Sequence, residues 1–275
     1  MRRRQLLAAL LLAPLLALPA ARAANLDDLK AGGVLRVAVY RDFPPFSFVH
    51  DGELGGIDVE LARAIGKKLG LTVNFMPLTP ADDVDGDLRN AVWKGHYLGG
   101  GTADLMLHVP FDAELARRND NAFLFGAYYR EQLAWAGSSV PASSWQIGTE
   151  KIAVENDSLA DLYLSALQAG RLRGQLQHYP TPAAASAALQ DGRATATFGT
   201  QSELEWLLRG GQWQLGQPQT PGLRKASWEV GMATKESLRD LAWAVSDALA
   251  ELRASGQLAA MFQRYHTSYR PPDEH

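Results

Sequence analysis

The sequence predicts an α/β fold with parallel strands. Predicted strands and helices alternate along the chain, the pattern typical of such sheets. The first strand, Val34 to Tyr40, reads VLRVAVY, a nearly continuous apolar and β-branched run that indicates burial on both faces. The alternation returns in the second half, so a second set of strands is expected there.

The first half is predicted to hold three strands and two helices. From Asp58 the apolar residues recur at helical spacing until Gly70 ends the helix, and Asp58 suits the first turn as a cap. A second strand is expected at Thr72 to Met76, a helix from Asp82 to about Trp93, and a third strand at Ala103 to Val109.

The second half repeats this logic. Strands are expected at Tyr128 to Gly137 and Ile152 to Glu155, and Ser158 with Asp161 forms a capping box that opens a helix. The remaining predicted elements are a helix at Pro182 to Gln190, a strand at Ala194 to Phe198, a loop at Gly199 to Gln201, a capping box at Ser202 to Glu205, a strand at Trp228 to Thr234, a long helix from Ser237 and, after Gly256, a last helix.

Residues 1–23 form a predicted signal peptide. Three arginines precede an apolar run, and Ala21-Arg22-Ala23 ends it with small residues at the two positions that a signal peptidase recognises. We expect cleavage after Ala23 or Ala24 and a location in the periplasm; general secretion and twin-arginine export both stay open. The chain has no cysteine, so it has no disulfide, thiolate metal site or lipid-anchored cysteine.

Charge argues against one class of partner. Without residues 1–23, the 27 basic and 30 acidic residues become 23 and 30, a net charge of −7. Nucleic-acid-binding proteins present a basic face, so nucleic acid is not expected as a partner. The balance is compatible with a basic protein partner.

The stretch from Asp82 to Asp112 carries the most unusual composition. Trp93, His96 and Tyr97 precede Gly99-Gly100-Gly101, and three successive glycines stay ordered only when something packs on them. An aromatic cluster beside such a turn indicates a contact surface. The alternative is a local hydrophobic patch, and the residues alone leave both open.

Several segments resemble one family. LRVAVYRDFPPFSF with GGIDVELARAIGKKLGL, then TADLML, FGAYYREQLAWAG, LQDGRATATFGTQSELEW and AELRASGQLAAMFQRY, resemble the periplasmic solute-binding proteins of the amino-acid-binding type. The resemblance implies a type II periplasmic binding protein fold with two domains, two crossing strands and an open interdomain cleft. Domain one would then span residues 24–130 and 226–275, and domain two residues 131–225.

Two departures concern the ligand. Family members that bind amino acids hold the carboxylate with an arginine in a Thr-x-x-Arg segment and the ammonium with a second-domain aspartate. Here the Thr-x-x-Arg form is absent, Arg117 matches only across a gap, and Thr195 and Thr200 stand where aspartates would. A buried ammonium without a partner is costly, so we do not expect α-amino acids to bind by the usual means.

The segment DLRNAVWKGHYLGGGTADLMLHVPFD narrows the resemblance. It is similar to the accessory periplasmic proteins of the MxaJ/XoxJ type, which accompany quinoprotein methanol dehydrogenases. This implies a protein that assists maturation or activation of a PQQ-dependent alcohol or methanol dehydrogenase, with or without its cytochrome c, and holds no cofactor itself. Trp93, His96, Tyr97 and Gly99 to Gly101 would form the partner surface. The alternative is the binding component of an importer for a small non-amino-acid solute.

The candidate cleft residues stand mostly at carboxyl ends of strands, where open α/β sheets bind ligands. They are Tyr40, Pro44, Phe46, Asp58, His108, Pro110, Phe111, Arg117, Ser158, Thr200 and Gln201. Packing is the alternative for the apolar ones, helix capping for Ser158, and a plain loop for Thr200 and Gln201. Histidines lack close ligand spacing, so no metal site is expected. Nucleophile motifs are missing too, so no enzyme is expected.

Overall fold

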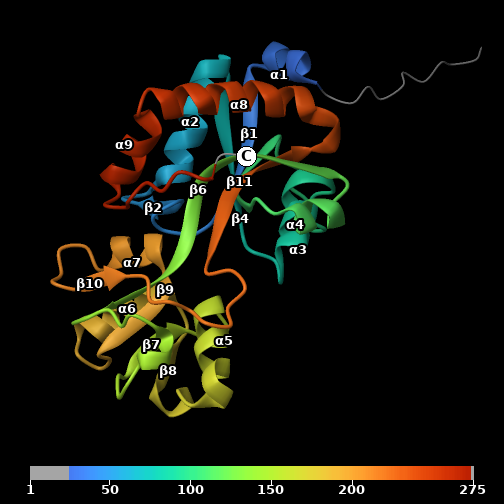
Figure 1. Cartoon of the computed structure of the whole chain (residues 1–275). Coiled ribbons are helices and arrows are strands. Elements are labelled where there is room, and N and C mark those ends of the chain that lie inside the picture. Colours follow the sequence, from blue (N-terminus) through green and yellow to red (C-terminus); the bar gives the residue numbers. More distant parts are fainter. Residues whose placement is uncertain (1–24, 274–275) are drawn as a thin grey trace, which may run out of the picture.

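The structure is a computed structural model that describes residues 25–273, so the expected signal peptide lies outside the described residues. Two bodies of sheet and helix lie one above the other and are joined by strands β6 (Ala122–Gly137) and β11 (Ser227–Lys235) (Figure 1). Within the described part of the chain, no helix has the length and apolar character needed to cross a membrane.

The upper body is built on strands in the order β4 (Thr72–Leu78), β1 (Val34–Tyr40), β5 (Leu105–Pro110), β11 and β6. Strand β1 runs parallel to β4 and β5, while β11 is antiparallel to β5 and β6. A short hairpin, β2 (Phe48–His50) and β3 (Glu53–Gly55), follows β1.

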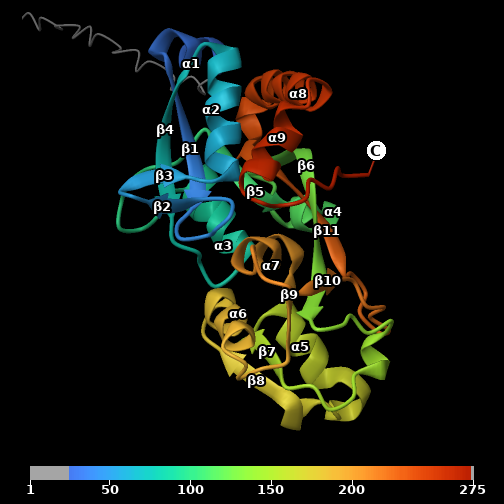
Figure 2. The ribbon, with the colours of Figure 1, turned by 90° about the vertical axis from the view of Figure 1, so that its left-hand side faces the viewer.

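Helices cover both faces of the upper sheet (Figures 1 and 2). Leu35, Val37 and Val39 of β1 pack in one cluster with side chains of α2 (Ile57–Leu69), α8 (Arg239–Ala254) and α9 (Gln257–Arg264). Ala38 packs in another with α3 (Val84–Leu88), its π-helical continuation Arg89–Trp93, and α4 (Ala113–Arg118). The first strand is therefore buried on both faces, as its composition predicts.

The lower body uses the second half of β6. Strand β9 (Ala196–Thr200) pairs antiparallel with β6, then β7 (Ile152–Glu155) and β8 (Leu176–Tyr179) follow in parallel. Strand β10 (Gln214–Gly216) pairs with β6. The helices are α5 (Leu159–Ala166), α6 (Pro182–Gln190) and α7 (Gln201–Leu207). The remaining elements are α1 (Leu26–Gly32) in the upper body and short 3-10 turns at Ser144–Gln146, Leu167–Gly170, Arg173–Gln175 and Glu236–Leu238.

Strand β6 crosses between the bodies. Residues 122–132 pair with β11, and residues 133–137 pair with β9, so one 16-residue strand belongs to both sheets. The largest upper cluster of buried side chains draws on residues 35–129 and 230–262, and the main lower one on residues 133–198. The domain limits expected at residues 130 and 226 stay a prediction.

Helix α7 and the C-terminal segment also connect the bodies on one side (Figure 2). The ring of Trp206 on α7 lies 5.4 Å from that of Phe48 in the upper hairpin. After α9, the Ser268 backbone N–H donates to Glu205 on α7 (2.7 Å), and the Arg270 guanidinium pairs with the same carboxylate at 3.3 Å.

Two local expectations are wrong. Gly199 and Thr200 belong to β9, and α7 begins at Gln201, so the expected loop is absent from this place in the described chain. The N-cap of α7 is Thr200, whose hydroxyl donates to Glu203, while Ser202 lies buried within the first turn of the helix. The helix therefore begins two residues earlier than the expected capping box at Ser202 to Glu205 implies.

Candidate ligand-binding cleft

Three cavities meet where the bodies join. A lower cavity of about 440 Å³ and an upper one of about 390 Å³ share Pro110, Thr200 and Trp228. A third, of about 620 Å³, also uses Pro110 and Trp228 and extends over Phe111 and Arg130. Pro110 is the last residue of β5 and Trp228 the second residue of β11, and these two residues form a wall common to all three cavities. Such volumes fall in the usual range of small-molecule sites.

Tyr40 lines the upper cavity at the end of β1. Its hydroxyl donates to Asp87 on α3 (2.7 Å), and the other oxygen of that carboxylate accepts the Ala81 backbone N–H (2.7 Å). Burial and the Asp87 carboxylate raise the pKa of Tyr40, and burial raises the pKa of Asp87. Tyr40 is therefore a neutral donor, already committed to Asp87.

His108 lines the same cavity and is held from behind. Its backbone has a φ of 60°, which non-glycine residues seldom adopt. Its Nδ1 lies 3.1 Å from one oxygen of Asp58, and the Tyr128 hydroxyl donates to the other (2.6 Å). The imidazole packs on Phe46 with ring centroids 4.2 Å apart. Asp58 and Phe46 thus support His108 from inside the upper body.

Glu131 faces the cleft from β6 with 2 % of its surface exposed. It accepts hydrogen bonds from the Ser202 hydroxyl and from the Gln132 backbone N–H (2.8 Å). Burial raises the pKa of Glu131 to about 8, so its carboxyl group is mostly protonated at neutral pH. The Arg270 guanidinium is 3.5 Å away but pairs also with Glu205 and Tyr129.

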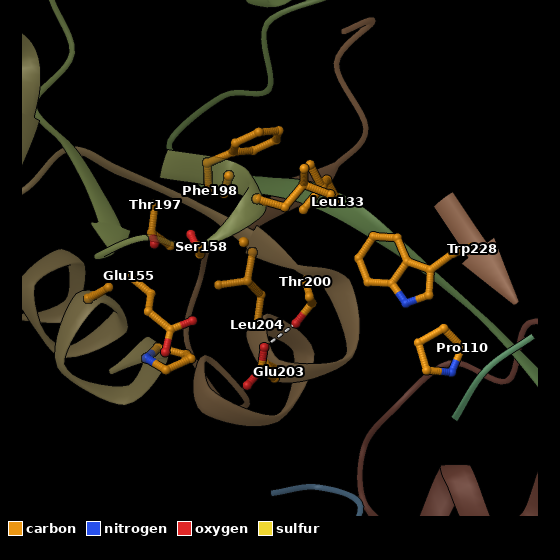
Figure 3. Close-up of a pocket in the computed structure, with 15 residues that line it drawn as sticks. Pro110, Leu133, Glu155, Ser158, Thr197, Phe198, Thr200, Glu203, Leu204 and Trp228 are labelled. Atoms are coloured by element: carbon orange, nitrogen blue, oxygen red, sulfur yellow. Dashed lines mark hydrogen bonds between the residues drawn. The ribbon is translucent and has the colours of Figure 1, made fainter. Parts of the chain in front are cut away.

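The lower cavity is mainly apolar, with carboxyl groups on one side (Figure 3). Phe198, Leu204 and Trp228 belong to the apolar lining, while Glu155 ends β7 and Glu203 lies in the first turn of α7. Burial raises the pKa of Glu203 to about 7 and also raises the pKa of Glu155.

Ser158 borders this cavity as the cap of α5. Its side chain accepts the Asp161 backbone N–H (3.1 Å), the role expected of a capping residue. The Asp161 carboxylate in turn accepts the Asp157 backbone N–H (3.0 Å) and contacts His178 (2.9 Å). The first turn of α5 therefore already has a negative charge beside it.

The structure brings together some of the expected cleft residues and separates others. Those that line the cavities are Tyr40, His108, Pro110, Phe111, Ser158 and Thr200. Phe46 and Asp58 are wrong as cleft residues, because they are 0 % and 1 % exposed and belong to the upper core. Arg117 is exposed on α4 and Pro44 is half-buried in the loop after β1, and neither borders these three cavities.

Gln201 also borders none of these three cavities. Its amide contacts Gln132 and donates to Glu205 (2.6 Å), so it links β6 to α7. Sequence reasoning missed Trp228, Glu131, Glu155 and Glu203. Of these, Glu155 had the clearest signal, because it is the last residue of a predicted strand and so stands at the ligand edge of its sheet.

The loop 93–101 borders none of the three cleft cavities. Trp93 is half-buried against the cluster that covers Ala38, whereas Tyr97 and Leu98 are 88 % and 78 % exposed. The Arg36 guanidinium donates to the Gly100 carbonyl (2.8 Å), and the His96 and Tyr97 rings lie 4.5 Å apart. The base of the loop is thus tied to β1 while its tip stays free for contact.

No group of three or more His, Asp or Glu side chains among residues 25–273 is placed to hold a metal ion.

Comparison with known proteins supports the fold. Residues 35–91 match the family described as bacterial extracellular solute-binding proteins, family 3. No curated protein sequence is significantly similar to this chain. An ancestral cationic amino acid solute-binding protein has 19 % identity and a TM-score of 0.69, with 88 % of this chain and 99 % of that one covered.

Two further solved structures support the same fold. An L-arginine-bound amino acid transporter substrate-binding protein from Streptococcus pneumoniae has 21 % identity and a TM-score of 0.59, covering 87 % and 97 % of the two chains. A histidine kinase sensor domain similar to periplasmic binding proteins has 22 % identity and a TM-score of 0.60, covering 86 % and 98 %. The chain therefore has the two-domain type II periplasmic binding protein fold, and the proteins it resembles are binding proteins and a sensor domain.

Proposed function

We propose that this chain is a periplasmic accessory protein that assists maturation or activation of a PQQ-dependent alcohol or methanol dehydrogenase by binding it or part of it. The observation that carries the proposal is the segment WKGHYLGGG, which resembles the MxaJ/XoxJ type and forms an exposed loop with an apolar tip. The cytochrome c that serves such a dehydrogenase is a candidate second partner.

The geometry of this loop suits protein contact. Tyr97 and Leu98 have the largest exposed fractions among the large apolar side chains of the described chain. Interface cores favour tyrosine and other large apolar residues, and a few of them carry most of the affinity. Because Arg36 fixes the Gly100 carbonyl and Trp93 packs on the core, little order has to be gained on binding.

A binding experiment with matched variants tests the proposal. The chain is immobilised and the purified dehydrogenase is passed over it, with and without its cytochrome c. We expect the double variant Tyr97→Ala with Leu98→Ser to weaken binding at least tenfold, at about 1.4 kcal/mol per tenfold. The control is Trp243→Ser, which removes another exposed apolar side chain, 64 % exposed on α8. Equal binding by both variants would contradict the loop as the contact.

The cleft favours a second candidate, the binding of a small solute other than an α-amino acid for import. The lower cavity is largely apolar and of ligand size, and neither an arginine for a carboxylate nor an aspartate at the position of Thr200 stands in it. Native mass spectrometry of protein taken directly from the periplasm tests this candidate. A small molecule released from the protein supports this candidate. A native mass equal to that of the ligand-free chain, measured under gentle conditions, counts against it.

A further inference from the structure

We propose that the lower cavity binds a small organic monocation, an alkyl- or arylammonium ion without a carboxylate, with its ammonium between Glu155 and Glu203 and its apolar body against Trp228 and Pro110. The inference rests on the second candidate function, ligand binding in the cleft. It does not depend on the contact of the loop 93–101 with a dehydrogenase.

The lining is suited to such a molecule in its shape and charge. The fifteen lining residues, all in the described part of the chain, include two glutamates and no lysine, arginine or histidine. In Figure 3 the carboxyl groups of Glu155 and Glu203 lie on one side and Trp228 with Pro110 on the opposite side. A guest that spans the cavity therefore meets negative charge at one end and an aromatic, apolar surface at the other.

The two carboxyl groups lack a cation of their own. Among the hydrogen bonds and ion pairs of residues 25–273, none involves the side chain of Glu155, which is half-buried at the end of β7. Glu203 accepts a hydrogen bond from the Thr200 hydroxyl, and no ion pair of the described chain includes it. The charge of Glu155 also contributes to the raised pKa of Glu203.

Desolvated like charges favour an incoming cation. A carboxylate removed from water without a counter-charge is costly, and an ammonium placed between two of them removes both the repulsion and the unmet hydrogen bonding. Trp228 is shared with the upper cavity, so the bound body would also touch the wall that both domains use.

A carboxylate on the guest would be disfavoured. The one positive feature nearby is the first turn of α5, and Ser158 and Asp161 already occupy its capping positions. An anion or a zwitterion would therefore meet Glu155 and Glu203 with no side-chain cation of the cavity lining to offset them. The ligand class is a cation with an apolar body.

The test uses a matched series on the whole protein at pH 8, where Glu203 is mostly ionised. Calorimetry compares 2-phenylethylamine, 2-phenylethanol, 3-phenylpropionate and phenylalanine, which share one aromatic body. We expect the amine to bind at least tenfold tighter than the other three. Glu155→Gln and Glu203→Gln should each weaken the amine roughly tenfold or more, the worth of a charge-assisted hydrogen bond. Both changes remove the charge of a half-buried carboxyl group and keep its shape, so the variants should fold.

Asp247→Asn, an exposed acid on α8 of the upper body, serves as the control and should leave amine binding unchanged. Three outcomes would overturn the proposal: no amine binding tighter than about 10 mM, equal binding of the amine and the alcohol, or unchanged amine binding in both glutamine variants. A chain that binds the amine but no dehydrogenase would keep this inference and reject the accessory role.

Discussion

The buried Glu131 makes stability fall as pH rises. An acid whose pKa is raised on folding binds more protons in the folded than in the unfolded state between the two pKa values, so stability decreases with pH in that window. For Glu131 the window runs from the ordinary value of 4.5 to about 8. Each pH unit inside it costs about 1.4 kcal/mol, so the change from pH 5 to pH 8 is roughly 3 kcal/mol.

Burial is the main cause of the raised pKa of Glu131. Glu131 is 2 % exposed, and the charge of Glu203 adds to the effect of burial. The hydrogen bonds from Ser202 and Gln132 favour the ionised form and only partly offset it. The Arg270 guanidinium lies 3.5 Å from Glu131 and is shared with the closer carboxylate of Glu205 at 3.3 Å.

The variant Glu131→Gln isolates this group. Urea denaturation at pH 5, 6, 7 and 8 should show wild type and variant close together at pH 5, with the variant gaining roughly 3 kcal/mol on wild type by pH 8. For a chain of this size that corresponds to a relative rise in melting temperature of roughly 6–12 °C. A difference between the two proteins that stays constant over the four pH values would refute the raised pKa.

Three further predictions concern the cleft, the loop and the C-terminal segment. Free α-amino acids should bind no tighter than about 1 mM, or about −4 kcal/mol, in calorimetry, because Arg117 is exposed on α4 and Thr200 stands at the end of β9; a micromolar affinity would overturn this. Trp93→Ala should lower the melting temperature by several degrees, because its half-buried ring packs on the core, while Tyr97→Ala should change it by less than about 2 °C; the reverse order would show that the loop base is misassigned. Arg270→Ala should cost about 3 kcal/mol, seen as a melting point lowered by at least roughly 6 °C, since it leaves the Glu205 carboxylate without its cationic partner; an unchanged melting point would mean that the C-terminal segment does not hold the bodies together.

Local patterns identified most of the framework. The apolar run of β1 predicted a strand buried on both faces, and α2 ends at Gly70 as its glycine signal indicates. Helix α6 spans Pro182–Gln190 as expected, because Thr181 and Pro182 supply a cap and a first-turn proline. Short elements such as α1, α4 and β8 were missed, since a few residues carry too little periodicity.

The site was less predictable because long-range contacts build it. Phe46 follows a strand end, which suggested the cleft, but the loop folds back and seats its ring beneath His108. Glu155 and Glu203 come together because β7 and β9 are parallel neighbours whose carboxyl ends share one edge, and no spacing in the sequence reports that pairing. Trp228 was expected only as a strand residue, although its ring borders all three cavities.

The most direct test of the accessory role is dehydrogenase activity in cells. A strain that lacks this chain is complemented with wild type, with the double variant Tyr97→Ala and Leu98→Ser, or with the control Trp243→Ser, at equal protein levels. PQQ-dependent alcohol oxidation is then measured in periplasmic extracts. We predict full activity with wild type and control and a loss of at least tenfold with the double variant. Full activity in the strain that lacks the chain would contradict the proposed function itself.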